Sequence, residues 1–216
     1  PAQLVDVVFD MFQYIYIYNG IELPRPRPLR NRRRLLYVGR VEHVKGVDVL
    51  LKAMPAIVKV LPDVHLSIVG DGAMRPELEA YVARRKLKAY VTFHGWLDTQ
   101  GVNDQYTQTT AVVIPSIWPE NLPTVCIEAL ATGRPVIGTR SGGIPELVQD
   151  DITGRIVAQN NPRELAAAIV DILSRPDLSA MSAACTASMQ DFKIATFIQN
   201  LEQLYRHTIE GMQEES

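Results

Sequence analysis

Two cationic side chains lie close together in the segment that follows the apolar run Leu35 to Gly39. Arg40 leaves the end of this run, and Lys45 stands just before Gly46, where an amphipathic stretch begins. Arginine presents a planar fork of donors and lysine a compact point charge, so the two could flank a diphosphate. Ordinary surface salt bridges would need the same residue types, and the spacing alone favours neither interpretation.

Two glutamates stand eight residues apart further along the chain, at Glu120 and Glu128. A helix is expected to run from Pro123, which puts Glu120 in the preceding loop and Glu128 about one and a half turns inside, a rise of about 8 Å. A carboxylate accepts well from the vicinal hydroxyls of a ribose. The alternative is a glutamate on a helix face that pairs with a nearby arginine or lysine, and the spacing by itself favours that alternative.

These side chains must be positioned by a larger framework, and the hydrophobic pattern indicates which one. Short β-branched runs alternate with amphipathic stretches from about residue 14 to residue 175, a rhythm typical of βα units around a parallel sheet. Strands are expected at Tyr14 to Tyr18, Leu35 to Gly39, Val64 to Val69, Val91 to His94, Ala111 to Ile114, Pro135 to Gly138 and Gly154 to Val157. Helices are expected from Gly46 to Leu61, Glu77 to Lys86, Pro123 to Thr132, Pro145 to Gln149, Pro162 to Ser174, Met181 to Met189 and Ile194 to Thr208. The fold class is therefore α/β, a Rossmann-like parallel sheet flanked by helices that ends in C-terminal helices.

Ligands of parallel α/β sheets bind where strands end and helices begin, because free N–H groups and the helix dipole meet there. Four loops of this kind are rich in glycine or charge, at residues 39–46, 70–72, 115–123 and 141–146. They suggest a ligand of the nucleotide type. The first loop has neither the Gly-x-Gly-x-x-Gly fingerprint nor Gly-Lys-Ser/Thr, which argues against a dinucleotide fold and a P-loop NTPase.

Composition excludes several classes of protein. The 216 residues hold 22 basic and 24 acidic side chains, so no global positive field exists to bind nucleic acid. Two cysteines give neither a metal-ligand spacing nor a disulfide framework, which fits a reducing compartment. Apolar runs of about five to eight residues are far shorter than the ~20 of a membrane helix, and no signal-peptide pattern opens the chain. We expect a cytoplasmic protein, and leave open peripheral attachment to the inner face of a membrane in the full-length protein.

The segment from Leu23 to Arg34 differs from the rest because it holds three prolines and six arginines. It is expected to be a stiff, exposed connector, with a basic patch for a membrane surface or a phosphate-rich partner as the alternative. Residues 1–13 are not assigned.

Taken together, these motifs resemble a known family. Arg40-x4-Lys45, Gly70-Asp71-Gly72, Glu120-x7-Glu128 and Gly142-Gly143-Ile144-Pro145-Glu146 follow in the order found in the C-terminal, donor-binding half of retaining GT-B glycosyltransferases. The family is glycosyltransferase family four, also called glycosyl transferases group one. The segment Tyr18-Asn19-Gly20-Ile21 extends the resemblance, which covers about residues 15–208.

The resemblance implies roles for individual residues. Residues matching Arg40 and Lys45 bind the donor diphosphate, the one matching Glu120 contacts the donor sugar, and the one matching Glu128 holds the ribose. Arg40, Lys45 and Glu120 are accordingly the expected catalytic residues. The expected donor-binding residues are Gly39, Gly70, Gly72, His94, Gly95, Trp96, Asn121, Leu122, Pro123, Thr124, Val125 and Glu128. No metal and no cofactor are expected, because no Asp-x-Asp pair accompanies the site and no histidine has a metal-spaced neighbour.

The resemblance also implies a domain organisation. Residues 14–190 would form the nucleotide-sugar-binding domain, and residues 191–216 a helix that packs on an N-terminal domain missing from this chain. The expected function is transfer of a hexose from a nucleotide-diphosphate sugar, such as a UDP-sugar, with retention of configuration. The acceptor would be a glycan, a lipid or a small molecule bound through the missing domain, so the isolated half is expected to be inactive. A non-catalytic sugar-nucleotide-binding module is the first alternative. A GT-B epimerase or phosphorylase is the second, and no pyridoxal-phosphate lysine is identifiable for the latter.

Overall fold

The computed structural model of the chain describes residues 21–29 and 33–214. Residues 1–13 and the expected strand Tyr14 to Tyr18 lie outside this range. The chain divides into two compact units, Leu23–Met189 and a smaller unit that includes Gln190–Ser216. The sheet and every expected site residue belong to the larger unit.

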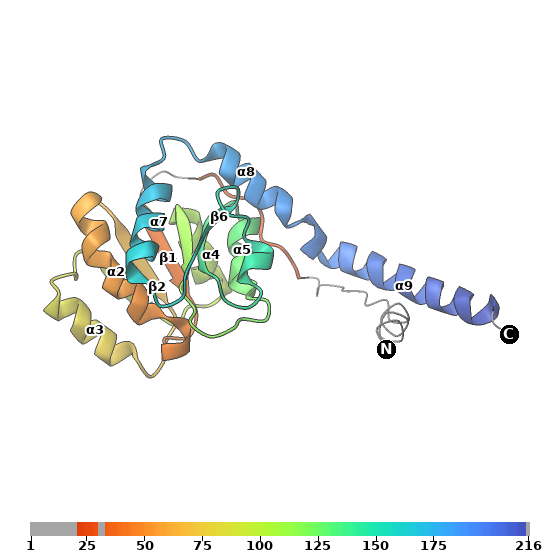
Figure 1. Ribbon diagram of the computed structural model, residues 1–216, viewed down its shortest axis with the longest axis horizontal. Coiled ribbons are helices and arrows are strands. Elements are labelled where there is room, and N and C mark those ends of the chain that lie inside the picture. The colour runs from red at the N-terminus through yellow and green to blue at the C-terminus, as the bar shows by residue number, and fades with distance from the viewer. Residues whose placement is uncertain (1–20, 30–32, 215–216) are drawn as a thin grey trace, which may run out of the picture. The chain divides into compact units, whose positions relative to one another are not determined.

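Six parallel strands form one sheet with the order β3-β2-β1-β4-β5-β6 (Figure 1). They are β1 (Arg34–Val38), β2 (His65–Val69), β3 (Val91–Gly95), β4 (Ala111–Ile114), β5 (Val136–Thr139) and β6 (Gly154–Val157). Each of the six lies within a residue or two of the expected run, because each run is short, apolar and bounded by turn residues. The Rossmann-like α/β fold class is confirmed.

Helices connect and flank these strands. They are α2 (Val47–Val60), α3 (Arg75–Arg84), α4 (Thr99–Gln108), α5 (Thr124–Ala131), α6 (Ile144–Leu147), α7 (Pro162–Ser174), α8 (Ser179–Ser188) and α9 (Ile194–Glu214), with 3-10 turns at His43–Lys45 and Gln190–Phe192. The sequence pattern missed α4, whose residues are mostly polar and whose one fully buried side chain is Tyr106. Asp98 starts this helix by accepting from the Gly101 amide at 2.8 Å, a capping bond that hydrophobic periodicity does not report.

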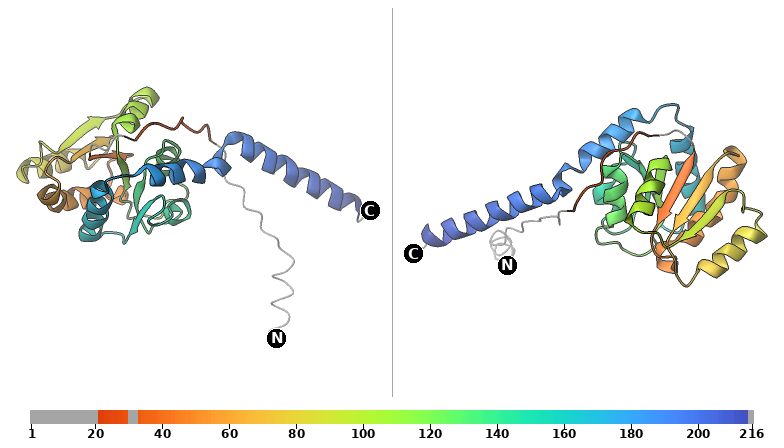
Figure 2. Two further views of the ribbon diagram at one scale, coloured as in Figure 1. Left: turned by 90° about the horizontal axis from the view of Figure 1, so that it is seen from above. Right: turned by 180° about the vertical axis from the view of Figure 1, so that it is seen from behind.

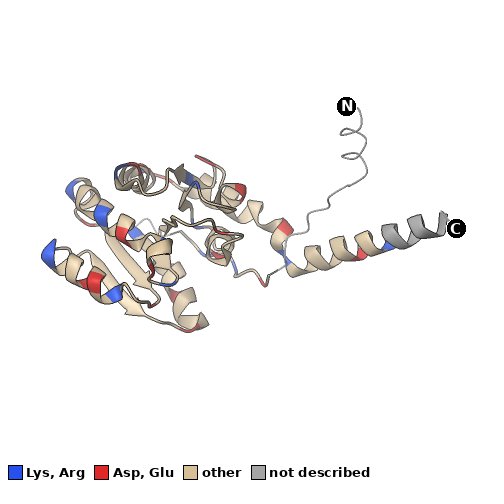
Figure 3. Cartoon of the chain, turned by 60° about the horizontal axis from the view of Figure 1, so that its bottom comes forward, with Lys and Arg blue, Asp and Glu red and all other residues tan. Residues whose placement is uncertain are grey.

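The core lies between the sheet and two layers of helices. On one face α2 packs against α7, while α4 and α5 cover the other face (Figures 1 and 2). The apolar stripe expected on α2 is buried, with Leu50, Met54 and Ile57 inaccessible to solvent. Basic and acidic residues both occur along the helices of this unit (Figure 3). Within the described residues, no helix combines the length and the apolar character that a membrane span needs.

A buried arginine holds the connector that precedes β1. The Arg134 guanidinium is fully buried and donates to the carbonyls of Arg27 at 2.6 Å and Pro28 at 3.0 Å. Burial lowers the pKa of Arg134 to about 10. The expected exposed connector is thus fixed to the larger unit at its Arg27–Pro28 backbone.

The smaller unit contains α9, which carries apolar side chains in solvent. Ile194, Ile198 and Tyr205 are each about half exposed or more, and their spacing places them along one side of a helix. That this helix packs on a further domain stays a prediction.

Candidate functional site

The strand order reverses between β1 and β4, because β1 leads through α2 to β2 and β4 leads through α5 to β5 in the opposite direction. The carboxyl ends of two such strands leave a crevice between diverging loops. A cavity of about 350 Å³ occupies it. Residues from the segments 37–45 and 113–125 line the cavity, so the loop of the two cations and the loop of the first glutamate are brought together.

Lys45 and Glu120 meet inside this cavity. The Lys45 ammonium lies 2.7 Å from Oε1 and 3.0 Å from Oε2 of Glu120, and the Ser116 hydroxyl donates to Oε1 at 2.6 Å. The side chains of Lys45 and Glu120 are only 25% and 16% exposed, so water screens the pair incompletely. A ligand that enters the cavity therefore meets a cation and a carboxylate already in place.

The backbone around Glu120 is fixed by the two glycines of the β5–α6 loop. A Cβ on Gly142 would lie 2.0 Å from the Glu120 carbonyl oxygen, and one on Gly143 would lie 2.1 Å from that of Asn121. The Gly143 amide donates to the Glu120 carbonyl at 2.6 Å. Only glycine permits this approach, so residues 142–143 hold the Glu120 loop in position.

Arg40 also lines the cavity, but its guanidinium has another partner. It pairs with Glu42 at 2.8 Å, and its side chain is 67% exposed. The backbone at Arg40 is fixed by a hydrogen bond, since the buried Tyr37 hydroxyl donates to the Arg40 carbonyl at 2.7 Å. The pair with Glu42 uses Nη1, so the remaining N–H donors of the exposed Arg40 guanidinium are accessible to a ligand.

Glu128 lies in α5 and is absent from the lining of the cavity. The Tyr106 hydroxyl of α4 donates to its Oε2 at 3.1 Å. In the described part of the chain, no lysine or arginine lies within ion-pair distance of Glu128, so the salt bridge considered from the spacing is not formed. Burial raises the pKa of this carboxyl, and the Tyr106 hydrogen bond only partly opposes the shift.

The start of α5 faces the cavity. Leu122, Pro123, Thr124 and Val125 line it, and Pro123 caps the helix without a side-chain hydrogen bond. The Cys126 amide donates to the Pro123 carbonyl at 2.9 Å, but among the described residues the Thr124 and Val125 amides have no backbone acceptor, so these two amides and the positive end of the dipole are available to an anion. Gly39 lines the cavity as well, whereas the carbonyl of Asn121 packs on Gly143.

The remaining expected site residues lie elsewhere. A Cβ on Gly70 would lie 1.9 Å from the Gly39 carbonyl oxygen, and one on Gly72 would lie 2.5 Å from that of Val41, so both glycines pack the β2–α3 turn on the β1–α2 loop. Those that do not line the cavity are Gly70, Gly72, His94, Gly95, Trp96, Asn121 and Glu128. Trp96 is 78% exposed. Among the described residues, no cluster of histidine, cysteine or acidic side chains is arranged to hold a metal ion.

Sequence reasoning missed three polar side chains of this region. Ser116 and Tyr37 contact the residues of the cavity, and Tyr106 contacts Glu128. Ser116 stands in the loop already singled out, so its position was a usable signal. Tyr106 carried none, because the helix that presents it was not expected.

Comparison with known proteins places the chain in a family. Residues 32–175 match the family model described as glycosyl transferases group 1. The chain belongs to the glycosyl transferases group 1 family. The matched range contains both loops of the cavity together with α4 and α5, and the family expected from the sequence motifs is confirmed.

Two curated relatives illustrate the similarity. Over 153 residues the chain is 34% identical to Spore coat protein SA of Bacillus subtilis, covering 68% of the chain and 41% of the relative. Over 199 residues it is 31% identical to the D-inositol 3-phosphate glycosyltransferase of Streptomyces scabiei, covering 82% of the chain and 44% of the relative. The chain thus spans less than half the length of these relatives.

Solved structures share the fold. Sucrose-phosphate synthase of Thermosynechococcus elongatus superposes with a TM-score of 0.79 at 30% identity, over 97% of this chain and 56% of that one. HepE of Anabaena, solved in complex with UDP, superposes with a TM-score of 0.74 at 23% identity, over 82% of this chain and 49% of that one. The Rossmann-like architecture therefore recurs within longer chains of known structure.

Proposed function

We propose that the cavity between the β1–α2 and β4–α5 loops binds a nucleotide-diphosphate sugar, and that the longer protein containing this chain transfers the sugar to an acceptor with retention of configuration. The observation that carries the proposal is the Lys45–Glu120 pair at the uncapped start of α5, inside a switch-point cavity. Relatives named as glycosyltransferases, and a structural neighbour solved with UDP, support it.

The positive groups of the cavity would favour cleavage of the bond between the sugar and the diphosphate. Transfer cleaves the bond from the anomeric carbon to the diphosphate, whose oxygen keeps the electron pair, while the acceptor oxygen forms the new bond and releases its proton to the departing phosphate. Lys45 and the amide end of α5 would stabilise the negative charge that develops on the diphosphate. Glu120, released from Lys45 by the incoming phosphates, would accept from hydroxyls of the sugar.

Glu128 would hold the ribose. It is half-buried, and among the described residues its one hydrogen-bond donor is the Tyr106 hydroxyl on Oε2, so its other oxygen can accept from a hydroxyl. A ligand donor there would stabilise the ionised form that burial disfavours. The nucleoside would then lie towards α5, with the diphosphate between Glu128 and Lys45 and the sugar beside Glu120.

Calorimetric titration of the chain with UDP, GDP, ADP and UDP-glucose tests the binding step. We expect a nucleoside diphosphate to bind, and Lys45→Ala to weaken it. Lys52→Ala is the matched control, because the exposed Lys52 pairs with Asp48 within α2 and does not line the cavity. Equal affinity in all three proteins would contradict the assignment of the cavity.

Transfer requires the longer protein, because productive geometry needs both the donor and the acceptor to be held. We expect the chain alone to bind the donor and transfer no sugar to an acceptor. A longer protein that binds the sugar nucleotide equally well yet transfers nothing would instead support the non-catalytic binding module.

A further inference from the structure

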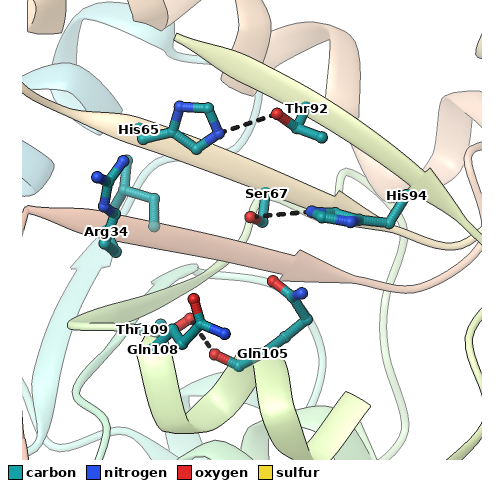
Figure 4. A pocket seen from close by; sticks show the side chains of 9 residues that line it. Arg34, His65, Ser67, Thr92, His94, Gln105, Gln108 and Thr109 are labelled. Carbon is teal, nitrogen blue, oxygen red and sulfur yellow. Dashed lines mark hydrogen bonds between the residues drawn. The ribbon is translucent and has the colours of Figure 1, made fainter. Parts of the chain in front are cut away.

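A second cavity of about 290 Å³ lies on the sheet and shares no lining residue with the first. We call it the side groove. Its sheet wall carries Arg34 of β1, His65 and Ser67 of β2, and His94 of β3, while Gln105 and Gln108 of α4 form the opposite wall (Figure 4). None of its residues is used by the proposed transfer chemistry.

The sheet wall of the groove is polar where a parallel sheet is usually apolar. Strands covered on both faces read as continuous hydrophobic runs, yet β2 and β3 place imidazoles and hydroxyls side by side here. His65 Nε2 lies 3.0 Å from the Thr92 hydroxyl, and His94 Nε2 lies 3.2 Å from that of Ser67. These cross-strand hydrogen bonds hold the polar side chains in fixed positions.

The opposite wall adds groups that are free to bind. Gln105 and Gln108 project from α4 towards the strands (Figure 4). Within residues 21–29 and 33–214, neither side-chain amide has a hydrogen-bond partner, and the Arg34 guanidinium has no ion-pair partner. Each amide offers two donors and an acceptor, and the guanidinium offers a charged fork.

Charge is confined to one end of the groove. Arg34 and His65 lie towards one end, and His94 and Gln105 towards the other (Figure 4). No carboxylate lines the cavity among the residues that the structure describes. Burial lowers the pKa of both histidines, which favours their neutral imidazoles, and Arg34 supplies the fixed positive charge.

We propose that the side groove binds a phosphorylated monosaccharide, with the phosphate at Arg34 and the ring hydroxyls between Gln105, Gln108 and the Ser67–His94 pair. A guanidinium pairs with phosphate through parallel charge-assisted bonds. Amides, hydroxyls and neutral imidazoles both donate and accept, as a ring of vicinal hydroxyls requires. The volume lies at about the lower limit of small-molecule sites, which suits one sugar ring.

The probe for this site is glucose 6-phosphate, compared with glucose and with inorganic phosphate. In titrations of the ¹⁵N-labelled chain we expect amide shifts at Arg34, Ser67, His94 and Gln105, and binding at least about tenfold tighter than for either fragment. Absence of these shifts at about 10 mM ligand, where a millimolar Kd would nearly saturate, overturns the proposal. Equal affinity for glucose 6-phosphate and for phosphate would contradict the proposal that the groove contacts the sugar ring. Shifts confined to Lys45 and Glu120 would also contradict it, because they would place the ligand in the first cavity.

Variants separate the two ends of the groove. Arg34→Gln should weaken glucose 6-phosphate about 10- to 100-fold, the loss of a charge-assisted pair, whereas Arg84→Gln on the exposed side of α3 should not. Gln105→Ala combined with Gln108→Ala should lower the affinity towards that of inorganic phosphate, since only the Ser67–His94 pair then contacts the ring. Nucleoside diphosphate binding, unchanged in all of these variants, reports that the fold is intact. An unaltered glucose 6-phosphate affinity in Arg34→Gln, or in the double glutamine variant, would refute the assignment.

Discussion

Glu120 lies in the β4–α5 loop beside a cation, whereas Glu128 lies inside α5 beside a phenol. Lys45 and Ser116 both contact Glu120 in the free protein, at 2.7 Å and 2.6 Å. Within the part of the chain that the structure describes, Glu128 has the Tyr106 hydroxyl as its one side-chain partner, and burial raises its pKa. The charge of Glu120 is therefore neutralised before any ligand arrives, while that of Glu128 is incompletely compensated.

This difference suggests how each carboxylate responds to a ligand. A diphosphate must compete with Glu120 for Lys45, so binding there exchanges one ion pair for another. A hydroxyl donor at Glu128 displaces no protein partner and adds a hydrogen bond to a poorly solvated charge. Two glutamates on one short segment thus offer an exchangeable contact and a pre-positioned one.

The largest expected effect is that of Lys45→Ala, which removes the cation of the exchangeable pair. Charge-assisted hydrogen bonds contribute about 1.5–3 kcal/mol, so nucleoside diphosphate binding should weaken about 10- to 150-fold, with little change for the nucleoside. Arg40→Ala should lose less, because Arg40 pairs with Glu42 and is 67% exposed. Calorimetry on both variants measures this order, and a larger loss for Arg40→Ala would reverse the roles of the two cations.

Glu128→Gln tests the pre-positioned contact. The side chain keeps its shape but loses its charge, so the nucleoside diphosphate and the sugar nucleotide should both weaken by similar factors, about tenfold for one charge-assisted bond. Titration with a 2′,3′-dideoxy nucleoside diphosphate is the control, because that ligand lacks the donors and should bind wild type and variant alike. Glu128→Gln should therefore lower the affinity for the ordinary nucleoside diphosphate and leave that for the dideoxy form unchanged. An equal loss for both ligands would contradict a contact with the ribose hydroxyls.

Glu120→Gln should behave in the opposite way. It frees Lys45 for the phosphates, so nucleoside diphosphate affinity should hold or rise, while the sugar nucleotide loses about tenfold from one charge-assisted bond to the sugar. In the longer protein, turnover should fall more than donor affinity if this contact strengthens at the transition state. An equal loss for nucleoside diphosphate in Glu120→Gln and Glu128→Gln would mean that the two carboxylates are misassigned.

Tyr106→Phe tests whether the phenol orients Glu128. Loss of one buried hydrogen bond costs about 0.5–1.5 kcal/mol, so nucleoside diphosphate binding should weaken about 2- to 12-fold while the ring continues to fill its place in the core. The pKa of Glu128 should rise further, since the hydrogen bond from Tyr106 lowers it. The pH below which nucleotide binding weakens should therefore shift upwards in the variant and not in Tyr81→Phe, on the exposed helix α3.

The smallest effect concerns stability. Because burial raises the pKa of Glu128 above its usual 4.5, the folded chain holds this proton more tightly than the unfolded chain. The stability that this group contributes is therefore greatest below the unfolded-state pKa and falls as pH rises through the folded-state pKa. Glu128→Gln cannot ionise at this position, so it should not show this loss of stability. The unfolding free energy of the variant minus that of the wild type should therefore increase as pH rises from 4 to 7. Urea unfolding at both pH values measures it.

The sequence by itself determined the parts of the fold that local pattern encodes. Apolar runs bounded by turn residues located the six described strands, and the buried stripe of α2 followed from helical spacing. The loop at residues 141–146 was singled out because it is rich in glycine at a strand end, while its close contact with the Glu120 loop came from the structure. Lys45 and Glu120 were chosen because residue type and place at a strand end restrict what chemistry is available.

Only the tertiary structure decided which of these residues meet. Lys45 and Glu120 are 75 positions apart, and they touch because β1 and β4 are neighbours in a strand order that local pattern does not encode. The contact of Tyr106 with Glu128 depends on α4, a polar helix whose place is set by packing on the sheet and not by its own periodicity. The side groove likewise exists because α4 faces polar positions of β2 and β3, a meeting of distant segments that no single stretch of sequence specifies.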